Sequence, residues 1–504
     1  MWLPAGRPQG PPLPGGRLVD VLLTHSYHLF YDPKQVRKMQ PYPPLGTLYA
    51  AALLRAQGFS VALFDTMLED PEQGFPAALA RHRPRLVVLY EDNFNFLSKM
   101  CLTRMRGVAF SMLDAALSAG AKVIANGSDA SDHAEEYLRR GFDYVLLGEA
   151  EWTLLELVQS LLRNAQLQPE QIPGVTYLDP TTARLFRTPR RPLLRDLDTL
   201  PLPARDLIQL EPYRRAWLDR HGVFSLNLVA SRGCPYRCNW CSRPIYGDSF
   251  HVRSASSVAG EMKQLKDRYG AGHLWFADDV FGLKHSWVEE LAEAVERQGA
   301  VIPFKIQSRV NLVTPEVACA LRRAGGTEVW MGVESGSQKI LDAMEKGTRV
   351  EWVPMARENL RREGIRACFF LQFGYPGETW ADILNTVELV RETRPEDIGV
   401  SVSYPLPGTK FYDRVREELG VKRNWVDSDD LAVMFKGAYT NDFYRALREA
   451  LHAEVDAWGA THPEGNGHGK NNGSHATSAD VEHLWNIVEQ MEKSCRNPEP
   501  TLVL

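Results

Sequence analysis

The sequence is poor in cysteine, with 7 in 504 residues. Such a sparse and odd set argues against a disulfide scaffold and for a reducing compartment, so we expect a cytoplasmic protein. No apolar run approaches the roughly 18 to 20 residues that a membrane-spanning helix needs, and we expect no transmembrane segment. The Pro- and Gly-rich start lacks the apolar core of a secretory signal, which predicts a flexible tail over 1–16. A net charge of −5 gives no reason to expect nucleic-acid binding.

At 504 residues the chain is too long for one hydrophobic core, so we expect several domains. Short apolar runs alternate with amphipathic helical patterns from about residue 17. Five runs indicate buried strands: 17–25, 59–66, 84–91, 121–127 and 142–149. This alternation predicts an α/β fold with a parallel sheet covered on both faces. We therefore expect a doubly wound, Rossmann- or flavodoxin-like domain over 17–165, with its ligand beyond the carboxyl ends of the strands.

A second alternating series follows a predicted hairpin and linker over 166–222. Its six strand patterns cover 224–231, 273–279, 303–309, 328–335, 366–374 and 397–405. Six such units predict a partial (β/α)6 barrel of the TIM type over 223–408, with an active site at the carboxyl ends of its strands. We expect a C-terminal helical region over 409–460. A flexible segment with a terminal helix is predicted over 461–504.

Three of the cysteines crowd onto one loop directly after the first strand of the second series. Cys234, Cys238 and Cys241 have the spacing Cys-x3-Cys-x2-Cys. A structural zinc ion normally has four protein ligands, and the nearest further candidate, His251, lies ten residues past Cys241. Thiolates also suit iron–sulfur clusters. A cubane cluster held by three cysteines keeps one iron open to a ligand from solution, and zinc remains the alternative.

The loop resembles that of the radical S-adenosylmethionine (SAM) enzymes, which have three cysteines at this spacing and an aromatic residue, here Trp240, before the last. The resemblance implies a [4Fe-4S] cluster on Cys234, Cys238 and Cys241 whose open iron binds SAM. Reductive cleavage of SAM then gives a 5'-deoxyadenosyl radical, which abstracts hydrogen from the substrate. It also implies an electron donor such as flavodoxin or ferredoxin.

Motifs at the ends of later strands resemble those of the same family and imply SAM contacts. The candidate residues are Trp240, Asp278, Asp279, Ser308, Arg309, Glu334, Ser335, Gln372 and Tyr404. Two alternatives stay open on the residues alone. Asp278 and Asp279 could simply cap the turn after their strand, and Glu334 could pair with Arg309.

The segments 42–66 and 125–157 resemble the cobalamin-binding domain that is fused to one large branch of this family. The motif Asp-x-His-x-x-Gly, whose histidine ligates cobalt in some cobalamin proteins, is absent. The resemblance therefore implies a corrin held mainly by backbone and loop contacts. Candidate residues are Thr24, Tyr27, Leu45, Gly46, Glu91, Asn93, Gly127, Ser128 and Asp129. His25 and His28, near the end of the first strand, are solvated residues or, less simply, cobalt ligands.

The resemblance implies a cobalamin-dependent methyltransferase that acts on an unactivated carbon or phosphorus centre. Radical cyclisation, carbon–carbon coupling or rearrangement without net methylation is one alternative. A non-catalytic iron–sulfur or cobalamin sensor is another. Abundant aromatic residues over 404–458 permit a small-molecule or lipid-like substrate, although burial in an ordinary core explains them equally well.

Overall fold

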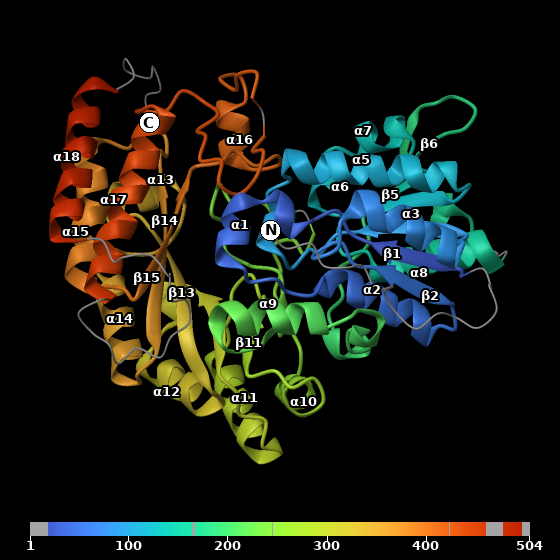
Figure 1. Cartoon of the computed structure of the whole chain (residues 1–504), viewed down its shortest axis with the longest axis horizontal. Helices are drawn as coiled ribbons and strands as arrows, with labels where there is room; N and C mark the ends of the chain where they lie inside the picture. Colours follow the sequence, from blue (N-terminus) through green and yellow to red (C-terminus); the bar gives the residue numbers. More distant parts are fainter. Residues whose placement is uncertain (1–18, 164–166, 244, 423, 460–476, 496–504) are drawn as a thin grey trace.

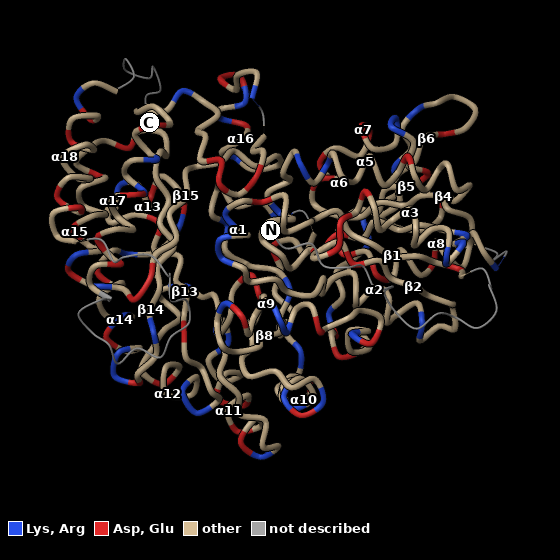
Figure 2. The backbone as a smooth tube through the Cα atoms, viewed as in Figure 1, with Lys and Arg blue, Asp and Glu red and all other residues tan. Residues whose placement is uncertain are grey.

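The computed structural model describes residues 19–163, 167–243, 245–422, 424–459 and 477–495. It contains two large sheets, one in each half of the chain, and Figure 1 shows the first at the right and the second at the left. The predicted tail over 1–16 and most of the predicted flexible segment over 461–504 lie outside the described residues. Basic and acidic residues intermingle along the outer helices (Figure 2). Within the described ranges, no helix has the length and apolar character to cross a membrane.

The first sheet confirms the predicted doubly wound domain. Its five parallel strands are β1 (Val21–Thr24), β2 (Val61–Phe64), β3 (Leu86–Tyr90), β4 (Lys122–Asn126) and β5 (Tyr144–Leu146). They run in the order β2-β1-β3-β4-β5. The order reverses between β1 and β3, and the carboxyl ends beside that point are where such sheets bind ligands.

Helices cover both faces of this sheet because its strands are apolar on both sides. Alternate strand residues divide between two cores, with Leu23 in one and Leu22 in the other. One face carries α2 (Leu45–Ala56) and α8 (Glu151–Arg163). The other carries α3 (Pro71–His82), α5 (Thr103–Ser118) and α7 (Ala134–Arg140). Shorter helices lie at the carboxyl edge: η1 (Leu29–Tyr31), α1 (Pro33–Lys38), α4 (Phe96–Lys99) and α6 (Ser128–Asp132).

The predicted hairpin forms, but it belongs to the first sheet. Strand β6 (Val175–Leu178) pairs antiparallel with β5, and β7 (Leu185–Arg187) pairs with β6. The rest of the expected linker contains η3 (Leu197–Thr199), η4 (Arg205–Leu207) and α9 (Glu211–His221), and η2 (Pro169–Gln171) precedes the hairpin. Buried Tyr213 and Trp217 of α9 donate hydrogen bonds to Asp65 (2.7 Å) and to the Pro41 carbonyl (2.7 Å). This segment is therefore a packed joint between the two halves.

The second sheet is a partial barrel of six parallel strands in the order β15-β14-β13-β12-β11-β8. The strands are β8 (Ser225–Leu228), β11 (His273–Phe276), β12 (Phe304–Ser308), β13 (Gly326–Glu334), β14 (Arg366–Phe373) and β15 (Asp397–Val402). Its helices are α10 (Ala255–Asp267), α11 (His285–Gln298), α12 (Pro315–Ala324), α13 (Gln338–Ala343), α14 (Trp352–Arg362) and α15 (Trp380–Thr393), with η5 (Val310–Leu312). A short antiparallel pair, β9 (Ser231–Arg232) and β10 (His251–Val252), flanks the cysteine loop.

The expectation of a largely helical C-terminal region is wrong for 416–440. Helices α16 (Lys410–Val415) and α17 (Asn441–Gly459) flank a stretch of turns, and α18 (Ser478–Ser494) follows as predicted. The stretch bonds to the first domain as well as to itself. The Thr103 N–H donates to the Trp425 carbonyl (2.9 Å), and the Ser428 hydroxyl donates to Asp32 (2.7 Å). These long-range bonds replace helical ones, which is why the local pattern did not predict the structure.

Candidate active site

The cysteine loop, residues 233–243, starts between β9 and β10 at the carboxyl edge of the second sheet. Gly233 has φ +82°, and a side chain there would collide with the Ser249 carbonyl, so only glycine fits this tight turn. The Asn239 N–H donates to the carbonyl of Met344 (3.0 Å), directly after α13. The Arg243 guanidinium donates to the Cys234 carbonyl (2.8 Å). The loop is thus held by its backbone, which leaves the thiols for other partners.

The three thiols lie near one another and fit an iron–sulfur cluster. All three are free, and burial together with the neighbouring Cys238 raises the pKa of Cys241 to about 12. Burial also raises the pKa of Cys234. In the described ranges, no group of three His, Cys, Asp or Glu side chains is placed to hold a single metal ion. A cubane binds each cysteine through a different iron and needs no such convergence.

Arg309 gives an independent sign that an anion belongs beside these thiols. It is 5 % exposed and has no ion pair with any described carboxylate. Its guanidinium donates to Cys238 Sγ (3.6 Å) and to the Lys346 carbonyl (2.5 Å), and it stacks 3.7 Å from the Tyr236 ring centre. A buried charge without a counter-ion is costly. Thiolates of an anionic cluster would compensate this one.

Glu334 lies at the carboxyl end of β13 in a strained conformation. Its φ of +64° is in the left-handed region, and the register of β13 shifts between Gly332 and Glu334. The carboxylate accepts a hydrogen bond from Lys346 Nζ (2.7 Å). Both partners are buried. The alternative that Glu334 pairs with Arg309 is therefore wrong. Strain of this kind persists where a site requires it, so Glu334 stays a candidate SAM contact.

The two aspartates after β11 have different environments. Asp278 is 2 % exposed and accepts hydrogen bonds from the Ala230 N–H (3.0 Å) and the Ser231 hydroxyl, which follow β8, so it bonds to a neighbouring strand end and not to the turn after its own strand. Burial raises its pKa to about 7. Asp279 forms an ion pair with Lys99 of α4, from the first domain. Asp279 is therefore the better placed of the two to face a ligand between the domains.

The side chains of the remaining candidate SAM residues contact other residues of the chain. The Ser308 hydroxyl donates to the Phe281 carbonyl (2.9 Å), and Gln372 Nε2 donates to Ser403 (2.9 Å). The Tyr404 hydroxyl donates to Asn424, and Trp240 packs beside Met344 in a small apolar cluster with its indole N–H unpaired. Ser335 is fully buried and bonds to Thr386 of α15 (3.3 Å) and to the Ser337 N–H (3.1 Å). Ser335 thus faces the helix layer, away from the other candidates.

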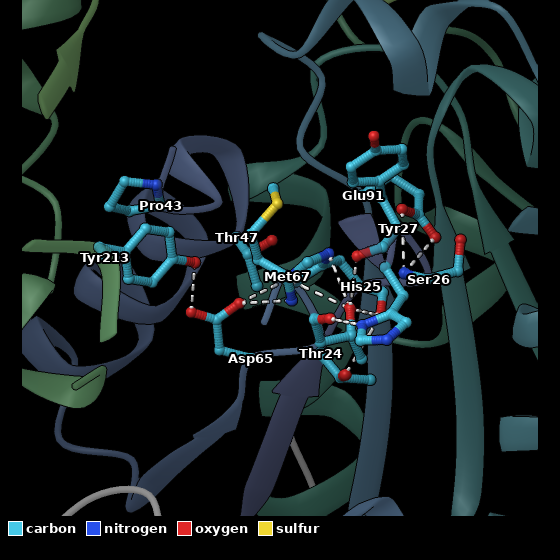
Figure 3. A network of polar contacts seen from close by, with 12 residues as sticks. Thr24, His25, Ser26, Tyr27, Pro43, Thr47, Asp65, Met67, Glu91 and Tyr213 are labelled. Atoms are coloured by element: carbon cyan, nitrogen blue, oxygen red, sulfur yellow. Dashed lines mark hydrogen bonds and ion pairs between the residues drawn. The ribbon is translucent and has the colours of Figure 1, made fainter. Parts of the chain in front are cut away.

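At the carboxyl edge of the first sheet, a buried network ties β1 to β2 (Figure 3). His25 bonds through Nε2 to Asp65 (2.9 Å) and through Nδ1 to Thr66 (3.0 Å). Asp65 also accepts from the Tyr213 hydroxyl (2.7 Å) and the Met67 N–H (3.1 Å). Both ring nitrogens of His25 are thus occupied, so it is not available to cobalt. His28 is buried and uses Nδ1 against the Thr66 carbonyl (2.7 Å).

Glu91 lies directly after β3, at the carboxyl edge where the strand order reverses between β1 and β3. Its two oxygens accept from the Ser26 N–H at 3.1 and 3.2 Å, which joins the ends of β3 and β1. Burial raises its pKa. Gly127, after β4, has φ +152°, and a Cβ there would lie 2.7 Å from the Glu91 side chain. The glycine is needed for this close approach.

The first turn of α2 packs against the same loop. A Cβ on Gly46 would lie 3.1 Å from the Glu91 carbonyl, and the Gly46 N–H donates to Asp92 (2.9 Å). Leu45 is fully buried beside it, and Thr24, at the end of β1, is equally buried. These residues shape the loop ends, as a corrin held by backbone would require.

Unpaired buried polar atoms gather on these loops and fit a ligand with many amide groups, such as a corrin. They are Tyr27 Oη, Asn93 Oδ1, Ser98 Oγ, Ser128 Oγ and Ser131 Oγ. Buried polar groups in folded proteins normally have partners, so a set of this kind on one edge indicates a bound molecule. Asp129 differs, because it accepts from Arg106 Nε (2.8 Å) and from the Tyr137 hydroxyl (2.7 Å). The carboxylate of Asp129 thus binds residues of α5 and α7.

Two sets of ion pairs join the two edges, one buried and one half-buried, and sequence reasoning missed them. Arg232 stands two residues before Cys234 and donates to Glu149 (2.6 Å), in the loop after β5, and to Glu151 (2.8 Å), the first residue of α8. All three are under a tenth exposed. The Lys99–Asp279 pair is the second such contact. Only the position of Arg232 next to the cysteines could have suggested its role, since Lys99 and Lys346 lie in stretches without a motif.

Comparisons with known proteins agree with this geometry. The model of the radical SAM superfamily matches residues 228–390, and the model of the B12 binding domain matches residues 39–158. A hopanoid C-3 methylase of Methylococcus capsulatus is 26 % identical over 463 residues, covering 87 % of this chain and 81 % of that protein. An uncharacterized methyltransferase of Pyrococcus horikoshii is 25 % identical over 387 residues, covering 76 % and 81 %.

Two solved structures share the whole fold. The radical SAM methyltransferase TsrM of Kitasatospora setae, solved with cobalamin and a [4Fe-4S] cluster, has a TM-score of 0.67 at 18 % identity, covering 95 % of this chain and 99 % of that one. The cobalamin-dependent SAM radical enzyme OxsB, solved with aqua-cobalamin and SAM, also has a TM-score of 0.67 at 18 % identity, covering 94 % and 71 %. The chain therefore belongs to the radical SAM superfamily, carries a B12 binding domain before its barrel, and is an enzyme whose cofactors are a [4Fe-4S] cluster, SAM and cobalamin.

Proposed function

We propose that the chain is a methyltransferase that uses a substrate radical to methylate an unactivated carbon or phosphorus centre. The observation that carries the proposal is the direct contact between the two cofactor edges, through Arg232 with Glu149 and Glu151 and through Lys99 with Asp279. Such contact supports a reaction in which a methyl donor and a radical generator act on one substrate. The methyltransferase and methylase names of the relatives support the same choice.

When bound, the cluster and SAM supply a radical that abstracts hydrogen, and cobalamin supplies a transferable methyl group. The chain's own residues position and shield these groups. The segment around Trp425 and Ser428 packs on the first domain, where it helps to exclude water. We propose a small-molecule substrate and, as electron donor, a flavodoxin or ferredoxin of the cytoplasm.

The test is to incubate anaerobically reconstituted protein with methyl-deuterated SAM, a chemical reductant and candidate substrates. A product that carries the deuterated methyl group, formed together with 5'-deoxyadenosine, is the expected result. A product without the label would show cyclisation, coupling or rearrangement instead. No 5'-deoxyadenosine from protein with an intact cluster and bound SAM would favour a sensor.

A further inference from the structure

The inner face of the barrel sheet differs from its outer face. The outward residues of β13 and β14 that face the helices, such as Val329, Met331 and Phe369, are at most 1 % exposed. The inward residues Trp330 and Phe370 retain accessible surface. Accessible surface also remains on Glu328 of β13 and on inward residues of the neighbouring strands: Trp275, Lys305, Gln307, Gly399 and Ser401. Cys368 and Gln372 of β14 are buried on this face. A packed barrel interior would bury the other residues as well, so this face is open to a ligand.

The inward residues form layers along the strands. The middle layer is aromatic, because Trp330 and Phe370 stack with ring centres 4.8 Å apart and planes 28° apart. Gly399, the neighbour of Phe370 on β15, keeps the surface of this pair low, since a Cβ there would lie 3.1 Å from Phe370 and 3.4 Å from Trp330. The pair thus offers a broad apolar surface of the kind that binds flat rings or hydrocarbon.

The layer toward the amino ends of the strands is basic. Lys305 of β12 contacts Gln40 (3.5 Å) and lies near the Tyr42 ring. Lys34 and Lys38 of α1 approach the same place, and Figures 1 and 2 show this helix, with its basic residues, between the two sheets. None of the three lysines has an ion pair among the described residues, and Lys34 donates only to the Ser428 carbonyl (3.4 Å).

The charges around these lysines leave a cationic excess. Glu328 is engaged by Arg366 (3.3 Å) and by the Trp330 indole N–H (2.7 Å), and Asp429 is engaged by Arg37 and Arg448. Asp32 is held by Ser428, and His452 is neutral because burial lowers its pKa to about 3. Among the described carboxylates near these lysines, Asp32 and Asp397 have no ion pair of their own, and together they offset only part of the charge of the three lysines. Burial and the nearby Lys38 lower the pKa of Lys34 to about 7, a cost that a bound anion would relieve.

We propose that this inner face binds an elongated substrate with a carboxylate or phosphate at one end and a flat or apolar body. The anionic group lies among Lys34, Lys38 and Lys305, and the body lies along Trp330 and Phe370. The far end then reaches the carboxyl edge, where the cysteines lie. From Glu328 to Glu334 a strand covers about 20 Å, which sets the length of such a molecule. This inference rests on the proposed function and adds the substrate class.

The test measures binding of 1-pyrenebutyrate and of its neutral counterpart 1-pyrenebutanol to the full chain, by fluorescence anisotropy and without turnover. We expect the acid to bind about tenfold more tightly than the alcohol, as one partly desolvated ion pair allows. Lys38→Gln should abolish most of that preference, and Trp330→Leu should weaken both probes. The matched control Lys263→Gln, on α10 beside Asp267, should change neither. Competition by dodecanoate and by dodecyl phosphate shows which anion is preferred.

Equal binding of acid and alcohol, no binding of either, or the same loss in the Lys38 and Lys263 variants would overturn the inference. Failure of the methyl-label experiment alone would not, because anisotropy reports binding without catalysis. Conversely, label transfer without any preference for the acid would leave the proposed function intact and remove this substrate class.

Discussion

The two carboxyl edges of the molecule hold their cofactors in opposite ways. On the barrel edge, three thiols, a buried guanidinium at Arg309 without an ion pair among the described residues and a strained Glu334 concentrate charge on a few atoms. On the first edge, the candidates with unpaired atoms are neutral hydroxyls and an amide, and the carboxyl groups of Glu91 and Asp129 already have protein partners. A cluster is fixed by three covalent bonds, whereas a large corrin is held by many weak contacts. The first kind of site leaves a sharp sequence motif and the second leaves a diffuse one.

The largest effect that would sharpen this comparison is Cys238→Ala. Loss of one of three cluster ligands should abolish cluster loading and 5'-deoxyadenosine formation. Corrin binding should persist, because Cys238 belongs to neither of the cores that cover the first sheet. Iron, sulfide and corrin analysis after anaerobic reconstitution checks both halves. Wild-type iron content in this variant would contradict the assignment of Cys238.

Arg232→Ala tests whether the two edges form one joint. The variant leaves the buried carboxylates of Glu149 and Glu151 without a counter-ion, which should lower the free energy of unfolding by about 3–5 kcal/mol. Anaerobic urea unfolding measures the shift of the midpoint. Arg37→Ala is the control, since its pair with Asp429 is exposed (59 % for Arg37) and should contribute at most about 1 kcal/mol. Similar losses of stability in both variants would show that the buried ion pairs of Arg232 contribute no more than an exposed pair.

Arg309→Gln separates two roles for this arginine. If it compensates the charge of the cluster, its loss should lower the cluster reduction potential by roughly 50–120 mV, the Coulomb energy of unit charges several Å apart at an effective dielectric constant near 20. Arg309→Lys should restore most of the shift. Redox titration followed by electron paramagnetic resonance gives the potentials. An unchanged potential with weaker SAM binding would instead assign Arg309 to SAM.

The smallest effect concerns Glu378, whose Oε1 is buried and unpaired while its other oxygen accepts from the Gly374 N–H (2.6 Å). Burial raises its pKa to about 8. Between the ordinary carboxyl pKa and pH 8 the folded chain holds a proton that the unfolded chain releases, so stability falls as pH rises. Glu378→Gln should flatten this fall by about 1–3 kcal/mol between pH 6 and 8. Thermal midpoints at the two pH values test it, and a parallel fall in both proteins would contradict it.

Much of the fold could be predicted from sequence because both sheets are parallel and built from continuous apolar runs. All eleven predicted parallel strands form. The hairpin is also present, but its pairing with β5 could not be read from local pattern. The stretch over 416–440 and the joint at Arg232 depend on contacts between residues far apart in the chain. In the site, spacing revealed the cysteines, whereas Lys99, Lys346 and Asp65 have no local signal. Ser335 shows the reverse case, a motif residue whose hydroxyl bonds to the helix layer.

The most direct test of the central claim, that the two edges face one shared site, is the magnetic interaction between a reduced cluster and Co(II) cobalamin in the same molecule. Electron paramagnetic resonance of the doubly loaded protein should show both signals broadened or split. The Cys238→Ala variant loaded with cobalamin alone should give the sharp Co(II) spectrum. If the doubly loaded protein gives the simple sum of the two isolated spectra, the cofactors are far apart and the account is wrong.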